Sequence, residues 1–105
     1  MAAEILVQAR VELAEAVEWY DAREDGLGGR LLAEAREAVA RIEAAPEAAA
    51  PWIVTRTKRE VRSLGFGSFP YRAFYVTAPR LVVVAFSHNA RRPGYWTARL
   101  RELGR

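Results

Sequence analysis

The spacing of the apolar residues changes once along the chain, and this change limits the folds that the chain can form. Up to about residue 45, apolar residues recur at steps of three and four, which predicts helices. After the stretch 46–57, which contains two prolines, short runs rich in aromatic and β-branched residues alternate with Gly and Pro turns. Such runs predict strands. A helical half followed by a strand half indicates the α+β class.

The first half predicts one short strand and a helical hairpin. Residues 4–8 (EILVQ) form a short apolar run that we interpret as a strand. Residues 11–23 have an apolar face, with Glu12, Glu15 and Glu18 on the other side. The glycine-rich stretch 26–29 interrupts this helix, and a second helix is expected from about 30 to 45. Two helices joined by a short glycine turn should pack antiparallel.

The second half predicts three strands and a short terminal helix. Residues 46–57 show no regular period and are expected to be a connection. Residues 58–64 alternate weakly and carry charges that suit an edge strand. Strands are also expected at 69–78 and at 81–86 (LVVVAF), and the latter is apolar on both faces, which is typical of a strand covered on both sides. Tight turns between the three strands predict an antiparallel meander.

The complete prediction is one domain over residues 1–105, with the order β-α-α-β-β-β and a short helix at 94–103. The helical hairpin should cover one face of a small antiparallel sheet. A chain of this length corresponds to a single domain, because domains usually span roughly 100–200 residues.

Composition excludes several classes of site. The absence of Cys excludes a disulfide scaffold, a Cys-ligated zinc site and a thiol nucleophile. His88 is the only histidine, so a site with several His ligands is excluded, and we expect neither a metal nor a cofactor. No apolar run approaches the ~18 residues that a membrane span needs, and the N-terminus lacks the pattern of a signal peptide. We therefore expect a cytoplasmic protein with no membrane contact.

Charge is divided unequally between the two halves. Residues 1–50 hold eleven acidic and five basic residues, a net charge of −6, whereas residues 51–105 hold eleven basic and two acidic residues, a net charge of +9. A strongly basic half attracts phosphates or an acidic protein segment. The alternative is that the basic half only neutralises the acidic half.

Four ordered segments carry a resemblance to a known family. They are residues 15–20 (EAVEWY), 26–28 (GLG) with the second helix and its Ala45-Pro46 end, 69–75 (FPYRAFY), and 84–88 (VAFSH) followed by 91–99 (RRPGYWTAR). Together they resemble the RelE/ParE toxin superfamily of bacterial type II toxin–antitoxin pairs, and the ParE-like, plasmid-stabilisation branch most closely. The resemblance implies the same strand and helix order, DNA gyrase as the usual target, and a cognate antitoxin, with a toxin–antitoxin heterotetramer as one assembly.

The RelE branch of the same superfamily implies a different activity, cleavage of mRNA on the ribosome. In those enzymes the Arg of a Tyr-Arg motif, here Arg72, binds the scissile phosphate. Those enzymes also use basic residues on the preceding strand to bind phosphate or assist proton transfer, and the candidates here are Lys58 and Arg62. They have a further Arg soon after the last strand, which here is Arg91. A terminal Tyr is replaced here by Trp96 in the simplest register. Because an indole only donates a hydrogen bond, the sequence favours the ParE-like interpretation.

Whether the chain is an enzyme stays open, and a non-toxic binding module is a third alternative. If it is an enzyme, the candidate catalytic residues are Arg62, Arg72 and Arg91. Each has a structural alternative. Arg72 shares a strand face with Phe74 and Val76 and needs a phosphate or carboxylate partner, which a helix Glu or the antitoxin would supply. Arg62 is expected to be solvated on an edge strand.

The remaining candidates lie after the last strand and at the end of the first helix. After residue 90, arginines alternate with aromatic residues. Such arginines can bind phosphates while the aromatic rings stack on bases. The alternative is that the aromatic residues pack on the sheet. Tyr95 is adjacent to Trp96 but would point elsewhere on a helix. His88 ends a strand, where its ring either acts as a base or bonds the backbone, and Trp19 either contacts a partner or packs on the second helix. The predicted target- or antitoxin-binding residues are Trp19, Arg72, His88, Arg91, Arg92, Tyr95, Trp96 and Arg99.

Overall fold

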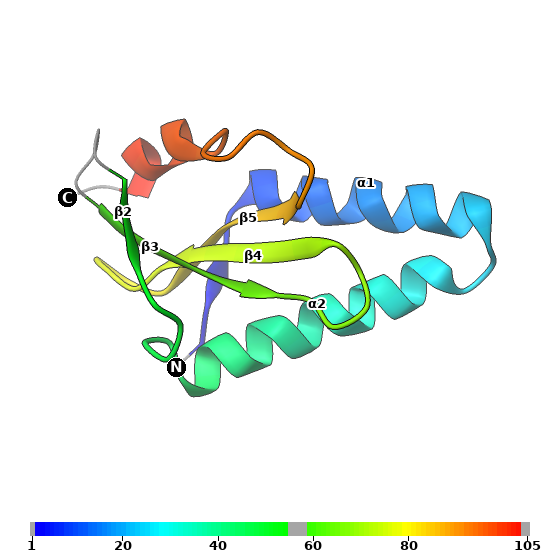
Figure 1. Ribbon diagram of the computed structural model, residues 1–105, viewed down its shortest axis with the longest axis horizontal. Helices are drawn as coiled ribbons and strands as arrows, with labels where there is room; N and C mark the ends of the chain where they lie inside the picture. The colour runs from blue at the N-terminus through cyan, green and yellow to red at the C-terminus, as the bar shows by residue number, and fades with distance from the viewer. Residues whose placement is uncertain (1, 55–58, 104–105) are drawn as a thin grey trace.

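The computed structural model describes residues 2–54 and 59–103 and has an α+β fold, as the sequence predicts (Figure 1). Its elements, in chain order, are β1 (Glu4–Ile5), α1 (Val7–Arg23), α2 (Leu27–Ala44), β2 (Trp52–Val54), β3 (Arg59–Gly65), β4 (Tyr71–Val76), β5 (Val82–His88) and the 3-10 helix η1 (Thr97–Leu103). No helix of the described segments is both long and apolar enough to cross a membrane.

The described strands form one sheet of five in the order β1-β5-β4-β3-β2. The pairs β2–β3, β3–β4 and β4–β5 are antiparallel, so the predicted meander is confirmed. β1 adds to the other side of β5 as a parallel strand, with Glu4 opposite Val82 and Ile5 opposite Val83. Because β1 has only two residues, the outer edge of β5 has no strand partner beyond Val83 among the described residues.

The sheet separates two apolar layers. On one face, the α1–α2 hairpin packs against side chains such as Tyr75, Val83 and Phe86. On the other face, Trp96 and the residues of η1 cover Val61, Val76 and Val84. β5 is therefore buried on both faces, as its continuous apolar sequence predicts. Figure 1 shows that the turn of the hairpin extends well beyond the sheet.

Several boundaries predicted for the first strand, the first helix and the connection after the second helix are wrong. The first strand is limited to Glu4–Ile5 and not 4–8, because Val7 already begins α1, four residues before the predicted start. β2 lies within a stretch that we expected to be irregular, since a strand of three residues is too short to show a period. Residues 55–58, Lys58 among them, lie outside the described segments.

Gly28 and Gly29, which were expected to lie in the break between the helices, instead lie inside α2. Gly26 adopts a left-handed backbone with φ of +87°, and α2 begins directly after it at Leu27, three residues earlier than expected. Gly28 then packs against α1, and its N–H donates a hydrogen bond of 2.7 Å to the Asp21 carboxylate. The predicted terminal helix at 94–103 is also shorter, and it is a 3-10 helix that begins at Thr97.

Candidate functional site

Arg72 lies on the sheet face opposite the hairpin, at the start of β4. Its neighbours Ala73 and Tyr75 point toward the hairpin, so Arg72 and Phe74 point to the other face. The Arg72 guanidinium donates to the Ser63 hydroxyl at 3.0 Å and to the Ser63 carbonyl at 3.4 Å, and the side chain stays exposed. Within the described segments it has no ion pair, so the expected salt bridge to a helix Glu is wrong.

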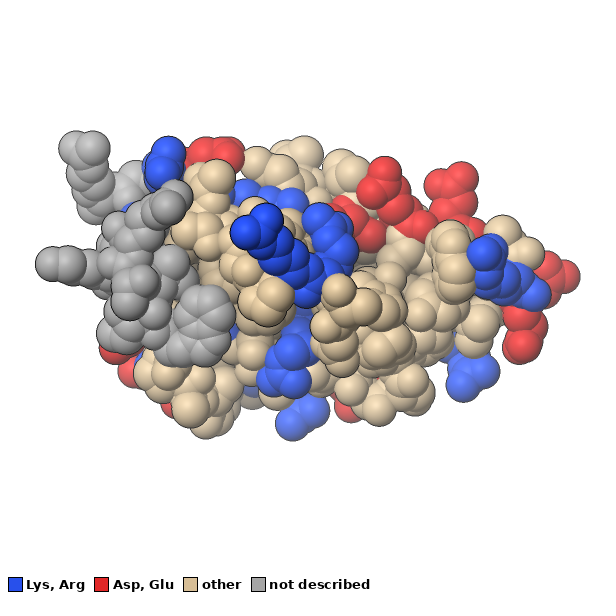
Figure 2. Space-filling model, turned by 45° about the horizontal axis from the view of Figure 1, so that its top comes forward, with Lys and Arg blue, Asp and Glu red and all other residues tan. Residues whose placement is uncertain are grey.

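A row of polar side chains connects Arg72 to the segment after β5. Ser87 stands opposite Arg72 in the β4–β5 ladder. Burial raises the pKa of the Tyr95 phenol, and Ser87 lies near enough to that phenol to lower the pKa against this larger effect. The Arg91 guanidinium stacks 3.8 Å from the centre of the Tyr95 ring. We call Arg72, Ser87, Tyr95 and Arg91 the basic row. Arg91 and the adjacent Arg92 are both exposed, and Figure 2 shows Lys and Arg side chains grouped over the middle of one face.

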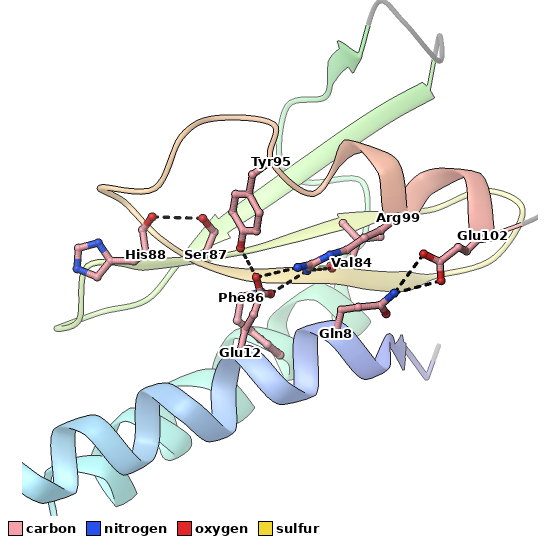
Figure 3. A network of polar contacts seen from close by, with 9 residues as sticks. All are labelled: Gln8, Glu12, Val84, Phe86, Ser87, His88, Tyr95, Arg99 and Glu102. Atoms are coloured by element: carbon pink, nitrogen blue, oxygen red, sulfur yellow. Dashed lines mark hydrogen bonds and ion pairs between the residues drawn. The ribbon is translucent and has the colours of Figure 1, made fainter.

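Glu12 of α1 connects this row to the free edge of β5 (Figure 3). Its carboxylate pairs with the Arg99 guanidinium through both oxygens, at 2.9 and 3.1 Å. It also accepts hydrogen bonds from the Tyr95 hydroxyl and, at 3.1 Å, from the Phe86 backbone N–H. Arg99 donates in turn to the Val84 carbonyl at 2.9 Å. The pair thus satisfies backbone groups that a longer β1 would have bonded.

Arg99 and Trp96 make their main contacts within the fold. The side chains of Arg99 and Glu12 are only 17% and 13% exposed, so Arg99 is engaged within the protein. Trp96 is 1% exposed and packs on Phe74, with ring centroids 5.0 Å apart. These internal contacts do not favour the predicted binding role of Arg99 and Trp96, which stays a prediction. Tyr95 was expected on a helix and pointing away from the site. Because η1 begins only at Thr97, Tyr95 lies before the helix, and its hydroxyl donates to Glu12.

Arg62 lies on the opposite face of the sheet from Arg72. It pairs in register with Tyr75 on the hairpin side and is 8% exposed. Its guanidinium donates to the carbonyls of Glu47 and Ala49, at 3.0 and 2.5 Å. The expectation of a solvated edge residue is wrong, because β2 pairs outside β3 and the preceding loop accepts the guanidinium's hydrogen bonds. Arg62 therefore stabilises that loop and cannot act together with Arg72 on one ligand.

His88 and Trp19 lie between α1 and the end of β5. The His88 Nδ1 accepts a hydrogen bond of 2.9 Å from the Ala90 N–H, which confirms the predicted bond of the ring to the backbone. Trp19 is 51% exposed, and the Arg23 guanidinium lies 3.5 Å from its ring centre. Trp19 thus does not pack in the core against α2, and it is available to a partner.

Glu12 and Ser63 were not singled out as site residues from the sequence. Glu12 is one of three similarly spaced acids on α1, and nothing in that pattern shows that its carboxylate alone turns to the sheet. Ser63 contacts Arg72 only because β3 and β4 pair in a particular register. In the described segments, no group of three or more metal-ligating side chains is present.

Burial raises the pKa of three tyrosines above the ordinary value of 10.0, and in Tyr95 the hydrogen bond to Glu12 adds to this effect. The folded state therefore holds these protons more tightly than the unfolded state. Their contribution to stability should be complete below about pH 10 and should be lost as the pH rises through the folded pKa values. Phenolate absorbance during an alkaline titration should show Tyr71, Tyr75 and Tyr95 ionising late, and Tyr95→Phe should remove one late group. Ionisation of Tyr71, Tyr75 and Tyr95 near pH 10 would contradict this.

A scan of the sequence against protein-family models gives no match, and a search of curated proteins gives no significant match.

Proposed function

We propose that this chain is the toxin of a ParE-like type II toxin–antitoxin pair, which acts in the cytoplasm and inhibits growth by binding DNA gyrase. The observation that supports this most is the exposed basic surface formed by Arg72, Arg91 and Arg92. Together with the order of the helices and strands, it agrees with what the four sequence segments imply. A cognate antitoxin would neutralise the toxin by covering this surface.

The charges of the two halves are only partly matched within the fold. Arg80 pairs with Glu4 at 2.7 Å and Arg99 pairs with Glu12, so some basic residues do neutralise the acidic half. In contrast, Arg72, Arg91 and Arg92 form no ion pair within the described segments. Unmatched arginines on one surface favour an acidic protein segment or a phosphate backbone as the partner, and they accelerate encounter with it.

Binding is favoured over catalysis by the chemistry of the basic row. Arginine stays protonated and cannot exchange a proton at physiological pH. Tyr95 has a raised pKa, caused by burial and then by its hydrogen bond to Glu12, so its phenol keeps its proton. Arg62, which a RelE-like enzyme would use beside Arg72, lies on the other face. These observations support a toxin that holds its target without cleaving it.

Induction of the chain alone should stop bacterial growth, and co-expression of its antitoxin should restore it. The antitoxin gene is expected next to the toxin gene, as a small reading frame with a DNA-binding segment and an acidic tail. The double variant Arg72→Ala/Arg91→Ala should lose growth inhibition while remaining folded. Arg30→Ala, which removes an exposed arginine of α2, is the matched control and should remain toxic. Normal growth with abundant, folded wild-type protein would refute the toxin proposal.

The target is tested with purified protein. The protein should inhibit DNA supercoiling by gyrase or trap gyrase–DNA cleavage complexes, and it should leave ribosome-bound mRNA intact. Cuts at codon positions in translated mRNA that disappear in Arg72→Ala would instead establish the RelE-like ribonuclease alternative. Inactivity in both assays together with normal growth would leave a non-toxic binding module.

A further inference from the structure

A groove of about 350 Å³ lies between α1 and the C-terminal end of β5. α1 contributes Glu15, Trp19 and Tyr20 to its lining, and the sheet with the following loop contributes Tyr71, His88 and Arg91. We call it the α1–β5 groove. It shares Glu12, Phe86 and His88 with the network of Figure 3 and otherwise has its own lining.

The lining of the groove is an unbroken series of rings. Trp19 contacts Tyr20 with centroids 4.9 Å apart, Tyr20 contacts Tyr71 at 6.4 Å, and Tyr71 contacts His88 at 5.1 Å, each edge to face. Half of the Trp19 surface is exposed, although a large aromatic side chain gains free energy from burial. The hydroxyls of Tyr20 and Tyr71 hydrogen-bond to no described residue. A flat ligand with polar edges would use both features.

Charged and polar groups differ between the two sides of the groove. On the α1 side, Glu15 forms no hydrogen bond or ion pair with any described residue, so both of its oxygens can accept from a ligand. On the β5 side, His88 Nδ1 already accepts from Ala90, which leaves Nε2 to carry the proton and donate. Arg91 adds a permanent positive charge beside it. One side therefore accepts from amino groups, and the other side binds anions.

We propose that the α1–β5 groove binds one nucleotide unit, with the base on the aromatic rings, its exocyclic amino group on Glu15, and its phosphate on His88 and Arg91. Each part of a nucleotide has a matching group in the groove. The aromatic rings can stack on any base, the carboxylate can bind the base edge, and the arginine can bind the phosphate. The volume lies at the lower end of the roughly 300–1,000 Å³ found for small-ligand pockets, which suits one nucleotide better than a peptide helix. The inference does not depend on the proposed toxin function.

His88 makes the test specific, because it is the only histidine in the sequence. Its imidazole NMR signals should shift on addition of CMP, AMP or GMP, whereas inorganic phosphate alone should cause little change. Cytidine, which lacks the phosphate, should bind more weakly than CMP. Single-stranded RNA and DNA oligonucleotides form the second arm. Stronger binding of an oligonucleotide than of the free nucleotide identifies a nucleic-acid strand as the source, and the reverse identifies a free nucleotide.

Two variants test the phosphate contact and the base contact separately. Arg91→Gln should weaken CMP about tenfold and leave cytidine unchanged, since a hydrogen bond to a charged group typically contributes this much. Glu15→Gln should weaken CMP more than UMP, because uracil has no exocyclic amino group. Glu18→Gln and Arg30→Gln, at exposed positions outside the groove, are the matched controls and should bind like wild type.

Three results would overturn the proposal. The first is an unchanged His88 signal at about 10 mM nucleotide, a concentration that nearly saturates even a millimolar site. The second is binding that Arg91→Gln and Glu15→Gln both leave unaltered in a folded protein. The third is a His88 shift caused only by a polypeptide partner, which would assign the groove to protein recognition. None of these results depends on whether the chain inhibits growth.

Discussion

Replacing Glu12 by alanine should lower the free energy of unfolding by about 3 kcal/mol. This is the lower end of the loss that is typical when one partner of a buried ion pair is removed. The variant leaves the Arg99 guanidinium without its carboxylate in a site where only 17% of the side chain is exposed. It also removes the acceptors of the Phe86 N–H and the Tyr95 hydroxyl. Chemical denaturation monitored by circular dichroism measures the loss.

The control for this prediction is on the same helix. Glu15→Ala removes an acid three residues later that bonds to no described residue, and it should change stability by less than about 0.5 kcal/mol. Arg99→Ala should cost about as much as Glu12→Ala, and the double variant should cost clearly less than the sum, because the two side chains form one interaction. Additive losses would show that Glu12 and Arg99 stabilise the fold independently.

Gly28→Ala should destabilise the protein by about 2–3 kcal/mol, at the upper end of typical overpacking costs. A Cβ at this position would collide with the Val17 carbonyl oxygen and would lie 2.7 Å from the carboxyl carbon of Asp21. Both atoms belong to α1, so the two helices would have to separate, and the hydrogen bond from the Gly28 N–H to Asp21 would be strained. Thermal or chemical unfolding measures the change.

The next residue is a matched control with the opposite expected sign. A Cβ at Gly29 has no neighbour within 4 Å, and Gly29 also lies inside α2. Gly29→Ala should therefore stabilise the protein by about 0.5–1 kcal/mol, the difference in helix propensity between the two residues. Equal effects of the two substitutions would mean that the close approach of α1 and α2 at Gly28 does not limit the packing.

The elements with a long or strong pattern were predicted correctly from sequence. The two helices, the antiparallel strands β3–β5 and the double-sided burial of β5 all follow from apolar periodicity and turn residues, which are local properties. The errors concern short elements and ends. β2 has three residues and β1 has two, and neither is long enough to show a period of its own. Their strand conformation depends on pairing with residues distant in the sequence.

The site shows the same division between local and tertiary information. The sequence alone determined that this chain is an α+β domain with no cysteine and one histidine, an acidic helical half and a basic strand half. It also identified Arg72 and Arg91 as candidates that the structure leaves exposed. Only the tertiary structure decided which side of the sheet each arginine occupies: Arg62 on the hairpin face, Arg72 on the other, and Arg99 against Glu12. The physical reason is that strand register and the short length of β1 create unpaired backbone groups at the edge of β5. Glu12 and Arg99 satisfy them, and no local pattern encodes contacts 74 or 87 residues apart.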